Sequence, residues 1–219
     1  MKERPVIFNG EMVRAILDGR KTKTRRPINP QPTLSERTGF NWKGAAYGIG
    51  STYRDTVRNF ANCFKTCPFG RVGDRLWVRE AYQGPLFNFD QMETYLEDTS
   101  KFERPEFCEY RADGGRTPEY YDADDNLRYG WKPSIHMPRW ASRITLEITT
   151  VRVERLNDIS EEDARAEGCC YGRGGGVPDF AVTPADHFPT LWASIYGEES
   201  WRANPWVWVI EFRRVEVEK

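Results

Sequence analysis

A run of basic and hydroxyl residues lies near the start of the chain, at residues 20–26 (RKTKTRR). Lys21 and Thr24 within this run are candidates for a nucleophilic set, because a Thr hydroxyl attacks a substrate only when a neighbouring base takes its proton. A Lys can serve as that base only if burial keeps it partly uncharged. Residues three apart in a regular strand point to opposite faces, so Lys21 must lie in the turn before the strand to meet Thr24.

Glu167 closes a short segment, residues 159–168 (ISEEDARAEG), that the sequence predicts to be a helix. Ser160 is a suitable N-cap, acids fill the first turn, and Gly168 is a suitable stop. A carboxylate in the last turn meets the negative end of the helix dipole, which suits a proton donor. Spacing alone nevertheless favours simpler roles, with Lys21 as a cation near a helix C-terminus and Glu167 as a solvated helix acid.

A second candidate surface combines basic and aromatic side chains on residues 75–80 (RLWVRE) and around residue 140. Arginines hold phosphates and tryptophan rings stack on bases, which predicts a local nucleic-acid surface. Basic side chains on strands also protect sheet edges from pairing, and the two explanations carry equal weight. The side chains expected to bind substrate or nucleic acid are Lys23, Arg25, Trp77, Arg79, Glu80, Trp140 and Arg143.

The composition limits the class of protein. The chain has 219 residues, with 32 Lys and Arg against 33 Asp and Glu, so no overall field draws it onto nucleic acid and any such contact must be local. The five cysteines follow no secreted disulfide pattern, and the N-terminus lacks the apolar core of a signal peptide. We therefore expect a cytoplasmic protein with reduced thiols and no membrane segment.

The cysteines and histidines raise the question of a zinc site. Cys63 and Cys67 are separated by three residues rather than two, and the adjacent Cys169 and Cys170 cannot both ligate comfortably. Buried free thiols explain this pattern better. We expect no metal and no cofactor.

The elements that must position these residues are short. The sequence predicts a helix that is capped by Asn9 and ends near Asp18, a helix over residues 188–196, and strands at 75–80, 142–153 and 206–217. Two irregular insertions are expected at about residues 27–66 and 84–135, and residues 169–186 are expected to form a Gly-rich loop. The order contains no βαβ repeat, which favours an α+β fold. The expected core contains Leu76, Val78, Ile144, Leu146, Ile148, Val207 and Val209.

Three pieces of the chain, in order, resemble the ASCH family. They are residues 19–25 (GRKTKTR), residues 73–78 (GDRLWV), and the helix at 159–168 followed by the strand WVWVIEF at 206–212. Two further segments, CPFG at 67–70 and IHMPRWASR at 135–143, are similar to the larger bacteriophage and prophage branch of that family. The resemblance implies one PUA-like domain over residues 1–219, a mostly antiparallel β-barrel with flanking short helices and the two long insertions. The matching pieces cover roughly half the chain.

The resemblance also implies a function. PUA-like domains bind RNA or modified bases, and some small bacterial ASCH proteins are amidohydrolases that remove the acetyl group from N4-acetylcytidine. Their Lys, Thr and Glu correspond to Lys21, Thr24 and Glu167. In that mechanism Thr24 attacks the amide carbonyl, Lys21 takes its proton, and Glu167 protonates the leaving amine. The present chain is about twice as long as a minimal barrel domain, so its insertions can close or reshape the pocket.

Two alternatives remain open. The protein can be a non-catalytic module of phage origin that binds RNA or a modified base. A ribonuclease is the weaker alternative, because the sequence shows no carboxylate cluster that would hold metal ions. A small closed pocket favours hydrolysis of a nucleoside, whereas an open basic groove favours binding of a polymer.

Overall fold

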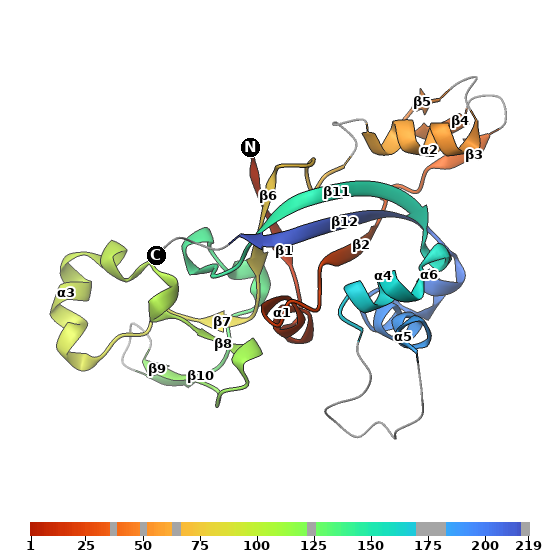
Figure 1. Cartoon of the computed structure of the whole chain (residues 1–219). Helices are drawn as coiled ribbons and strands as arrows, with labels where there is room; N and C mark the ends of the chain where they lie inside the picture. The colour runs from red at the N-terminus through yellow and green to blue at the C-terminus, as the bar shows by residue number, and fades with distance from the viewer. Residues whose placement is uncertain (36–38, 49–51, 63–66, 122–125, 170–182, 216–219) are drawn as a thin grey trace. The chain divides into compact units, whose positions relative to one another are not determined.

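A five-stranded mixed sheet is the largest regular element of the computed structural model (Figure 1). Its strand order is β1 (Glu3–Ile7), β6 (Arg75–Arg79), β11 (Thr145–Arg155), β12 (Trp206–Val215) and β2 (Lys23–Pro27). β1 and β6 are parallel, whereas β12 and β2 are antiparallel. The structure describes all residues except 36–38, 49–51, 63–66, 122–125, 170–182 and 216–219.

The α+β class is confirmed, but the expected closed barrel is not found among the described residues. A barrel requires the two outer strands of a sheet to pair, and here the strand order ends on β1 and β2. The β1–β6 pair is parallel, so the sheet is mixed. Alternating hydrophobicity predicts that a strand exists and which face is buried, but not the strand beside which it lies.

The chain divides into two compact units, each made of segments far apart in the sequence. Unit 1 contains Met1–Leu17, Arg75–Leu146 and Arg214–Lys219. Unit 2 contains Asp18–Asp74 and Glu147–Arg213. None of the helices in the described residues is long and apolar enough to span a membrane.

Unit 1 contains α1 (Gly10–Leu17), as the capping signal predicted. The side-chain oxygen of Asn9 accepts a hydrogen bond from the Met12 backbone at 2.9 Å, and Val13 and Ile16 are buried. Residues 82–141, which include the insertion expected at 84–135, hold mostly very short elements. The strands and helix of this part of unit 1 are β7 (Tyr82–Gln83), α3 (Met92–Glu97), β8 (Glu109–Tyr110), β9 (Glu119–Tyr121) and β10 (Leu127–Tyr129). Short 3-10 helices cover Phe89–Gln91, Thr99–Phe102, Pro105–Phe107, Arg111–Asp113, Ser134–His136 and Arg139–Ala141.

Unit 2 contains a small subsheet and a helix where an irregular insertion was expected. Within residues 27–66 the described elements are β3 (Thr33–Ser35), β4 (Gly39–Trp42), β5 (Ala45–Tyr47) and α2 (Tyr53–Asn62). Aromatic packing holds them: the Phe60 ring lies 4.5 Å from Phe40 and stacks on Trp208 at 5.2 Å, measured between centroids. These contacts join distant residues, so local periodicity did not reveal them.

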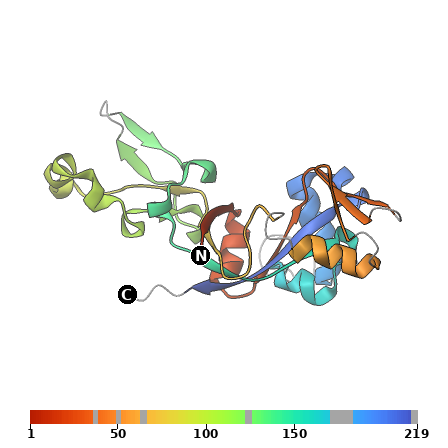
Figure 2. The same ribbon diagram turned by 90° about the horizontal axis from the view of Figure 1, so that it is seen from above.

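Three helices group together in unit 2 (Figure 2). They are α4 (Glu161–Ala166), α5 (Pro184–Tyr196) and α6 (Glu198–Arg202), and a 3-10 helix covers Leu156–Asp158. The predicted cap of α4 is confirmed, because Ser160 Oγ accepts a hydrogen bond from the Asp163 backbone at 3.1 Å. α5 begins within the expected Gly-rich loop, of which residues 170–182, including Cys170, lie outside the described part. An apolar cluster joins these helices to β12 through Leu156, Ala164, Phe188, Trp192, Val207 and Val209.

The expected core is confirmed residue by residue. All seven side chains named from strand periodicity are no more than 1% exposed: Leu76, Val78, Ile144, Leu146, Ile148, Val207 and Val209. Side chains on both faces of β12 are buried at its start. This explains why odd-numbered and even-numbered positions are both apolar there.

Candidate functional site

Basic side chains at alternate positions of one strand meet the acidic side of α4 in unit 2. Lys23 and Arg25 lie two apart in β2 and so share a face. Lys21, just before the strand, forms an antiparallel bridge with Glu167 at the end of α4. Asp163 and Glu167 are four residues apart, which places both carboxylates on one side of the helix end. Basic side chains two residues apart on β2 therefore face acidic side chains four residues apart on α4.

Lys21 and Glu167 form a buried ion pair. The Lys21 Nζ lies 2.8 Å from Glu167 Oε2, and the two side chains are 0% and 4% exposed. Nζ also donates to the backbone oxygens of Glu167 at 2.9 Å and Lys23 at 2.8 Å. Burial lowers the pKa of Lys21, and the Glu167 carboxylate opposes that shift. Three acceptors match the three N–H donors of an ammonium, which favours the charged amine in this arrangement.

Arg25 holds the carboxylates together. Its guanidinium lies 3.1 Å from Glu154, 2.6 Å from Asp163 and 3.3 Å from Glu167, and its side chain is fully buried. The Nε of Arg25 is buried without a hydrogen-bond partner. The guanidinium carbon lies 6.0 Å from the centroid of the Phe188 ring. The Arg25 guanidinium is therefore shared among three acids, and its Nε–H has no hydrogen-bond partner.

Asp163 receives hydrogen bonds from several cations. Lys23 Nζ lies 2.6 Å from Oδ1, while Arg25 and Arg152 donate to Oδ2 at 2.6 and 2.8 Å. Burial alone would raise the pKa of Asp163, but the bonds from Lys23 and Arg25 outweigh it and lower the pKa to about 2. Asp163 is therefore held as a carboxylate over the whole neutral range.

These residues form one charge-balanced group, which we name the Lys21–Glu167 cluster. Arg152 closes it through ion pairs with Glu154, Asp163 and Glu211. Equal numbers of cations and anions leave no net charge to attract an anion, so the cluster suits hydrogen bonding and proton transfer with a neutral polar ligand. Its members are Lys21, Lys23, Arg25, Arg152, Glu154, Asp163, Glu167 and Glu211.

Thr24 occupies the alternate position of the same strand. It is 2% exposed and lies opposite Ile210 in the β2–β12 register. Successive side chains of a strand point to opposite faces, so Thr24 points away from the face shared by Lys23 and Arg25. The structure thus brings Lys21 and Glu167 together and places the Thr24 side chain on the other face of β2.

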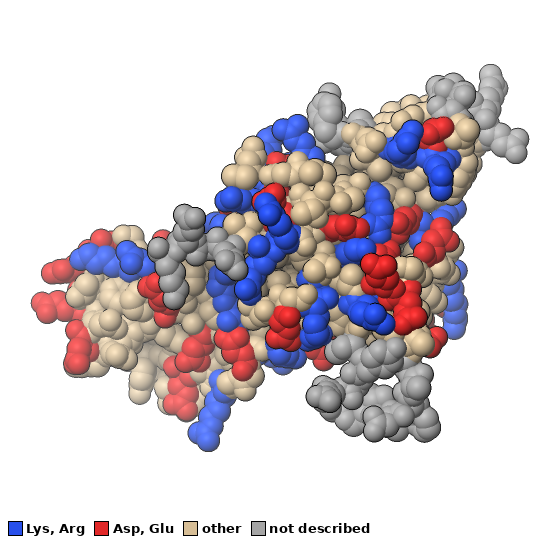
Figure 3. Space-filling view, in the orientation of Figure 1, with Lys and Arg blue, Asp and Glu red and all other residues tan. Residues whose placement is uncertain are grey.

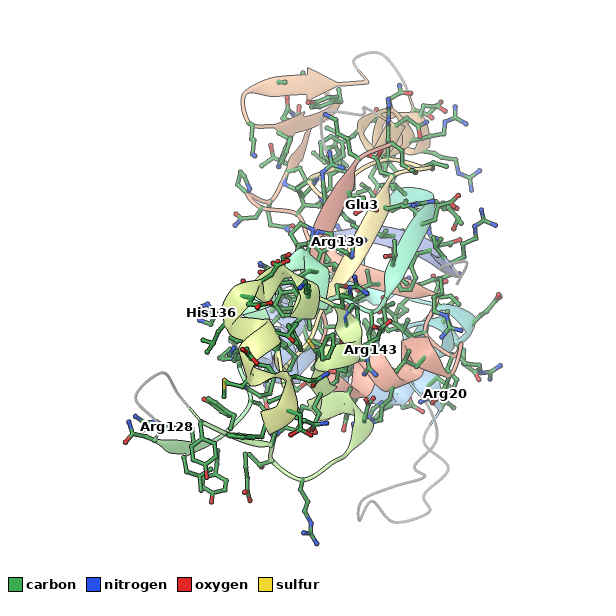
Figure 4. All side chains as sticks on the ribbon, turned by 90° about the vertical axis from the view of Figure 1, so that its left-hand side faces the viewer. Glu3, Arg20, Arg128, His136, Arg139 and Arg143 are labelled. Carbon is green, nitrogen blue, oxygen red and sulfur yellow. The ribbon has the colours of Figure 1, made fainter. Side chains whose placement is uncertain are left out.

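The remaining predicted binding residues belong to unit 1. Trp77 is 9% exposed, and the guanidinium carbons of Arg79 and Arg139 lie 4.9 and 6.0 Å from its ring centroid. Arg79 Nε donates to the Met137 backbone at 2.9 Å, and Arg139 Nε donates to Glu3 at 3.0 Å (Figure 4). These arginines hold neighbouring parts of unit 1 together and flank the Trp77 ring.

Glu80, which is buried, forms a second ion pair with the partly exposed Arg143. Both carboxylate oxygens of Glu80 accept from Arg143, at 3.0 and 3.1 Å, and Arg143 also donates twice to Asp113 at 2.8 Å. The Arg143 guanidinium carbon lies 3.9 Å from the Tyr110 ring centroid. Burial raises the pKa of Glu80, and Arg143 partly offsets that rise. Trp140 is half-buried against the apolar cluster that contains Tyr110.

Of the predicted unit 1 binding residues, Glu80 lines a pocket of about 440 Å³. Arg14 and Arg111 are also among its walls, and Arg14 donates to the Ala112 backbone at 3.0 Å. The predicted binding residues are thus divided, with Lys23 and Arg25 in unit 2 and the other five in unit 1.

Four members of the cluster were not predicted from the sequence: Arg152, Glu154, Asp163 and Glu211. A signal for one of them exists, because Asp163 precedes Glu167 by one helical turn, as expected for two acids that face an alternating basic strand. In the described residues, no group of three or more His, Cys, Asp or Glu side chains is arranged to hold a metal ion.

Comparison of this chain with protein-family models, with curated proteins and with solved structures returned no match in any of the three.

Proposed function

We propose that this protein recognises a nucleoside or an RNA base at the Lys21–Glu167 cluster and hydrolyses an N4-acylated cytidine there. The observation that carries the proposal is the buried contact between Lys21 and Glu167 at 2.8 Å, beside the unused Arg25 Nε donor. A neutral base offers carbonyl and ring-nitrogen acceptors to such a donor. The similarity of residues 19–25 to the ASCH motif supports the same assignment, and we extend the proposal to an ASCH-like, PUA-like origin for the chain.

Amide hydrolysis requires a nucleophile, a proton acceptor and a proton donor to the leaving amine. The proposed reaction needs the Thr24 hydroxyl, which lies on the opposite face of β2, to reach the acyl carbon when the substrate binds. Thr24 Oγ then bonds to the acyl carbon and passes its proton to the neutral form of Lys21. The short Nζ to Oε2 contact lets that proton move on to Glu167, which delivers it to N4 as the carbon–nitrogen bond breaks. Water then hydrolyses the acyl-Thr24 ester and restores the hydroxyl. Burial supports this role of Lys21 because it lowers the pKa of the amine.

Base binding without chemistry is the second candidate, and one observation favours it. The Lys21 amine donates to three acceptors, and an amine held in this way is a cation that takes up no further proton. In this candidate function the cluster supplies fixed hydrogen-bonding groups. Thr24 is then a buried packing residue with no chemical role.

Incubation of the purified protein with N4-acetylcytidine, followed by chromatographic detection of cytidine, tests the two candidates. Hydrolysis predicts turnover that Thr24→Val abolishes while nucleoside affinity stays within about threefold, since Val preserves the shape of the side chain. Thr149→Val, at an exposed position of β11, is the matched control and should keep full turnover. Saturable binding of N4-acetylcytidine without release of cytidine would instead assign the protein to base recognition, and absence of both would refute the proposal.

A further inference from the structure

A pocket of about 350 Å³ lies between α2 and β11 in unit 2. A volume of this size is at the lower end of small-ligand sites. Helix α2 is anchored beside it by Phe60, which is fully buried and stacks on Trp208. The pocket is lined by Tyr53, Arg54, Val57, Arg58, Arg152 and Trp206, among others.

One side of the pocket is aromatic and apolar. Tyr53 is 57% exposed, and its ring centroid lies 6.2 Å from that of Trp206 at a tilt of 37°. The guanidinium carbon of Arg155 lies 4.4 Å from the centroid of the Trp206 ring. Val57 and Val153 add aliphatic surface to the lining. An exposed ring beside aliphatic side chains is a surface on which a flat nucleobase stacks.

The rest of the lining is predominantly basic. Arg54 and Arg58 are exposed and lie four residues apart on α2, so they project from the same side of the helix. Figure 3 shows basic atoms gathered over α2. One guanidinium nitrogen of Arg58 lies 2.9 Å from Asp55 Oδ1, and the Arg58 side chain is 66% exposed. The pocket contains four arginines and two acids, whereas the Lys21–Glu167 cluster is balanced. An arginine excess next to an aromatic surface fits a phosphate attached to a base.

We propose that this pocket binds a nucleoside phosphate, with the base against Tyr53 and the phosphate held by Arg54 and Arg58. The site goes beyond the hydrolysis proposed above, because the residues proposed to hold the ligand, Tyr53, Arg54 and Arg58, lie outside the Lys21–Glu167 cluster and because it is assayed by binding alone. The two sites nevertheless share Arg152 and Glu154, which line the pocket and belong to the Lys21–Glu167 cluster.

The shared residues connect the pocket to the cluster. Arg152 pairs with Asp163 at 2.8 Å, and Glu154 pairs with Arg25 at 3.1 Å. A phosphate that reaches Arg152 competes with Asp163 for its guanidinium.

Calorimetric titration of the full chain with cytidine 5′-monophosphate and with cytidine tests the proposal. The monophosphate should bind about tenfold more tightly than the nucleoside, and this advantage should fall as salt increases. The double variant Arg54→Ala/Arg58→Ala should remove the advantage and leave cytidine affinity unchanged. Arg202→Ala, an exposed arginine of α6 that is paired with Glu199 at 2.8 Å, is the matched control. A short single-stranded oligocytidylate distinguishes the two sources of the ligand, since tighter binding than the monophosphate identifies a nucleotide within RNA and weaker binding identifies a free nucleotide.

Equal affinities for the monophosphate and the nucleoside would overturn the proposal, as would a double variant that behaves like Arg202→Ala. Absence of monophosphate binding would do the same. Because no step of this test requires turnover, its failure is distinguishable from failure of the hydrolase assay.

Discussion

Lys21 Nζ lies 2.8 Å from Glu167 Oε2, although 146 residues separate the two in the sequence. The contact is held by the antiparallel bridge between the same two residues and by a backbone hydrogen bond from Thr22 to Ala166 at 2.8 Å. The main chain therefore fixes both side chains before any ligand arrives. A buried pair fixed in this way is organised for binding or proton transfer, because little reorganisation remains to be made.

Removal of the Glu167 charge should strongly destabilise unit 2. Glu167→Gln removes the carboxylate that pairs with the buried Lys21 and one of the three carboxylates around Arg25, at a cost of about 3–5 kcal/mol. The double variant Lys21→Met/Glu167→Gln should cost less than the sum of the two single variants. Urea unfolding measures each free energy.

Glu161→Gln is the control for this experiment because Glu161 pairs with Arg165 at the surface of the same helix. This change should alter the free energy of unfolding by less than about 1 kcal/mol. If Glu167→Gln is no more destabilising than Glu161→Gln, the buried pair does not hold unit 2 together.

Acid should weaken the protein through Asp163. Its pKa is lowered from 3.8 to about 2 in the folded chain, so its contribution to stability is complete above the unfolded value. That contribution is lost as the pH falls from about 4 towards 2. The difference in unfolding free energy between the wild type and Asp163→Asn should therefore be largest near neutral pH and shrink over this window.

Chemical denaturation at a series of pH values measures the difference. Asp18→Asn removes an exposed carboxylate that pairs with Arg20 and should change stability by less than about 1 kcal/mol throughout. A difference for Asp163→Asn that stays constant between pH 6 and pH 2 would contradict the assignment.

The α2 helix should depend on Phe60. Phe60→Ala removes a fully buried ring that contacts both Phe40 and Trp208, and should cost about 3–5 kcal/mol. Phe89→Ala is the matched control, since Phe89 is 87% exposed and its loss should change stability by no more than about 0.5 kcal/mol. Thermal or urea unfolding followed by tryptophan fluorescence measures both changes, and similar values for the two variants would contradict the packing role of Phe60.

Local patterns in the sequence identified the helices α1 and α4, most of α5, and the strands β6, β11 and β12, whereas β1 and α2 were not predicted. The Asn9 cap of α1 and the Ser160 cap of α4 join residues three apart, so the sequence around each helix contains the whole signal. Strand periodicity likewise identified buried positions such as Leu76 and Val207, because alternation depends only on the pleat of one chain. Lys21 and Glu167 were singled out by residue type and by their resemblance to a known motif.

Only the tertiary structure decided which strands pair and which charges meet. The strand order β1-β6-β11-β12-β2 leaves the sheet open, and no periodicity within a strand encodes its neighbour. Arg25 meets Glu154 and Asp163 across 129 and 138 residues, so these partners follow from chain packing rather than spacing. The Trp77 ring was expected to bind substrate or nucleic acid; it is 9% exposed, and the guanidinium carbon of Arg139, 62 residues further along the chain, lies 6.0 Å from its centroid. Ion pairs and aromatic contacts act over a few ångströms in space, and sequence separation carries little information about that distance.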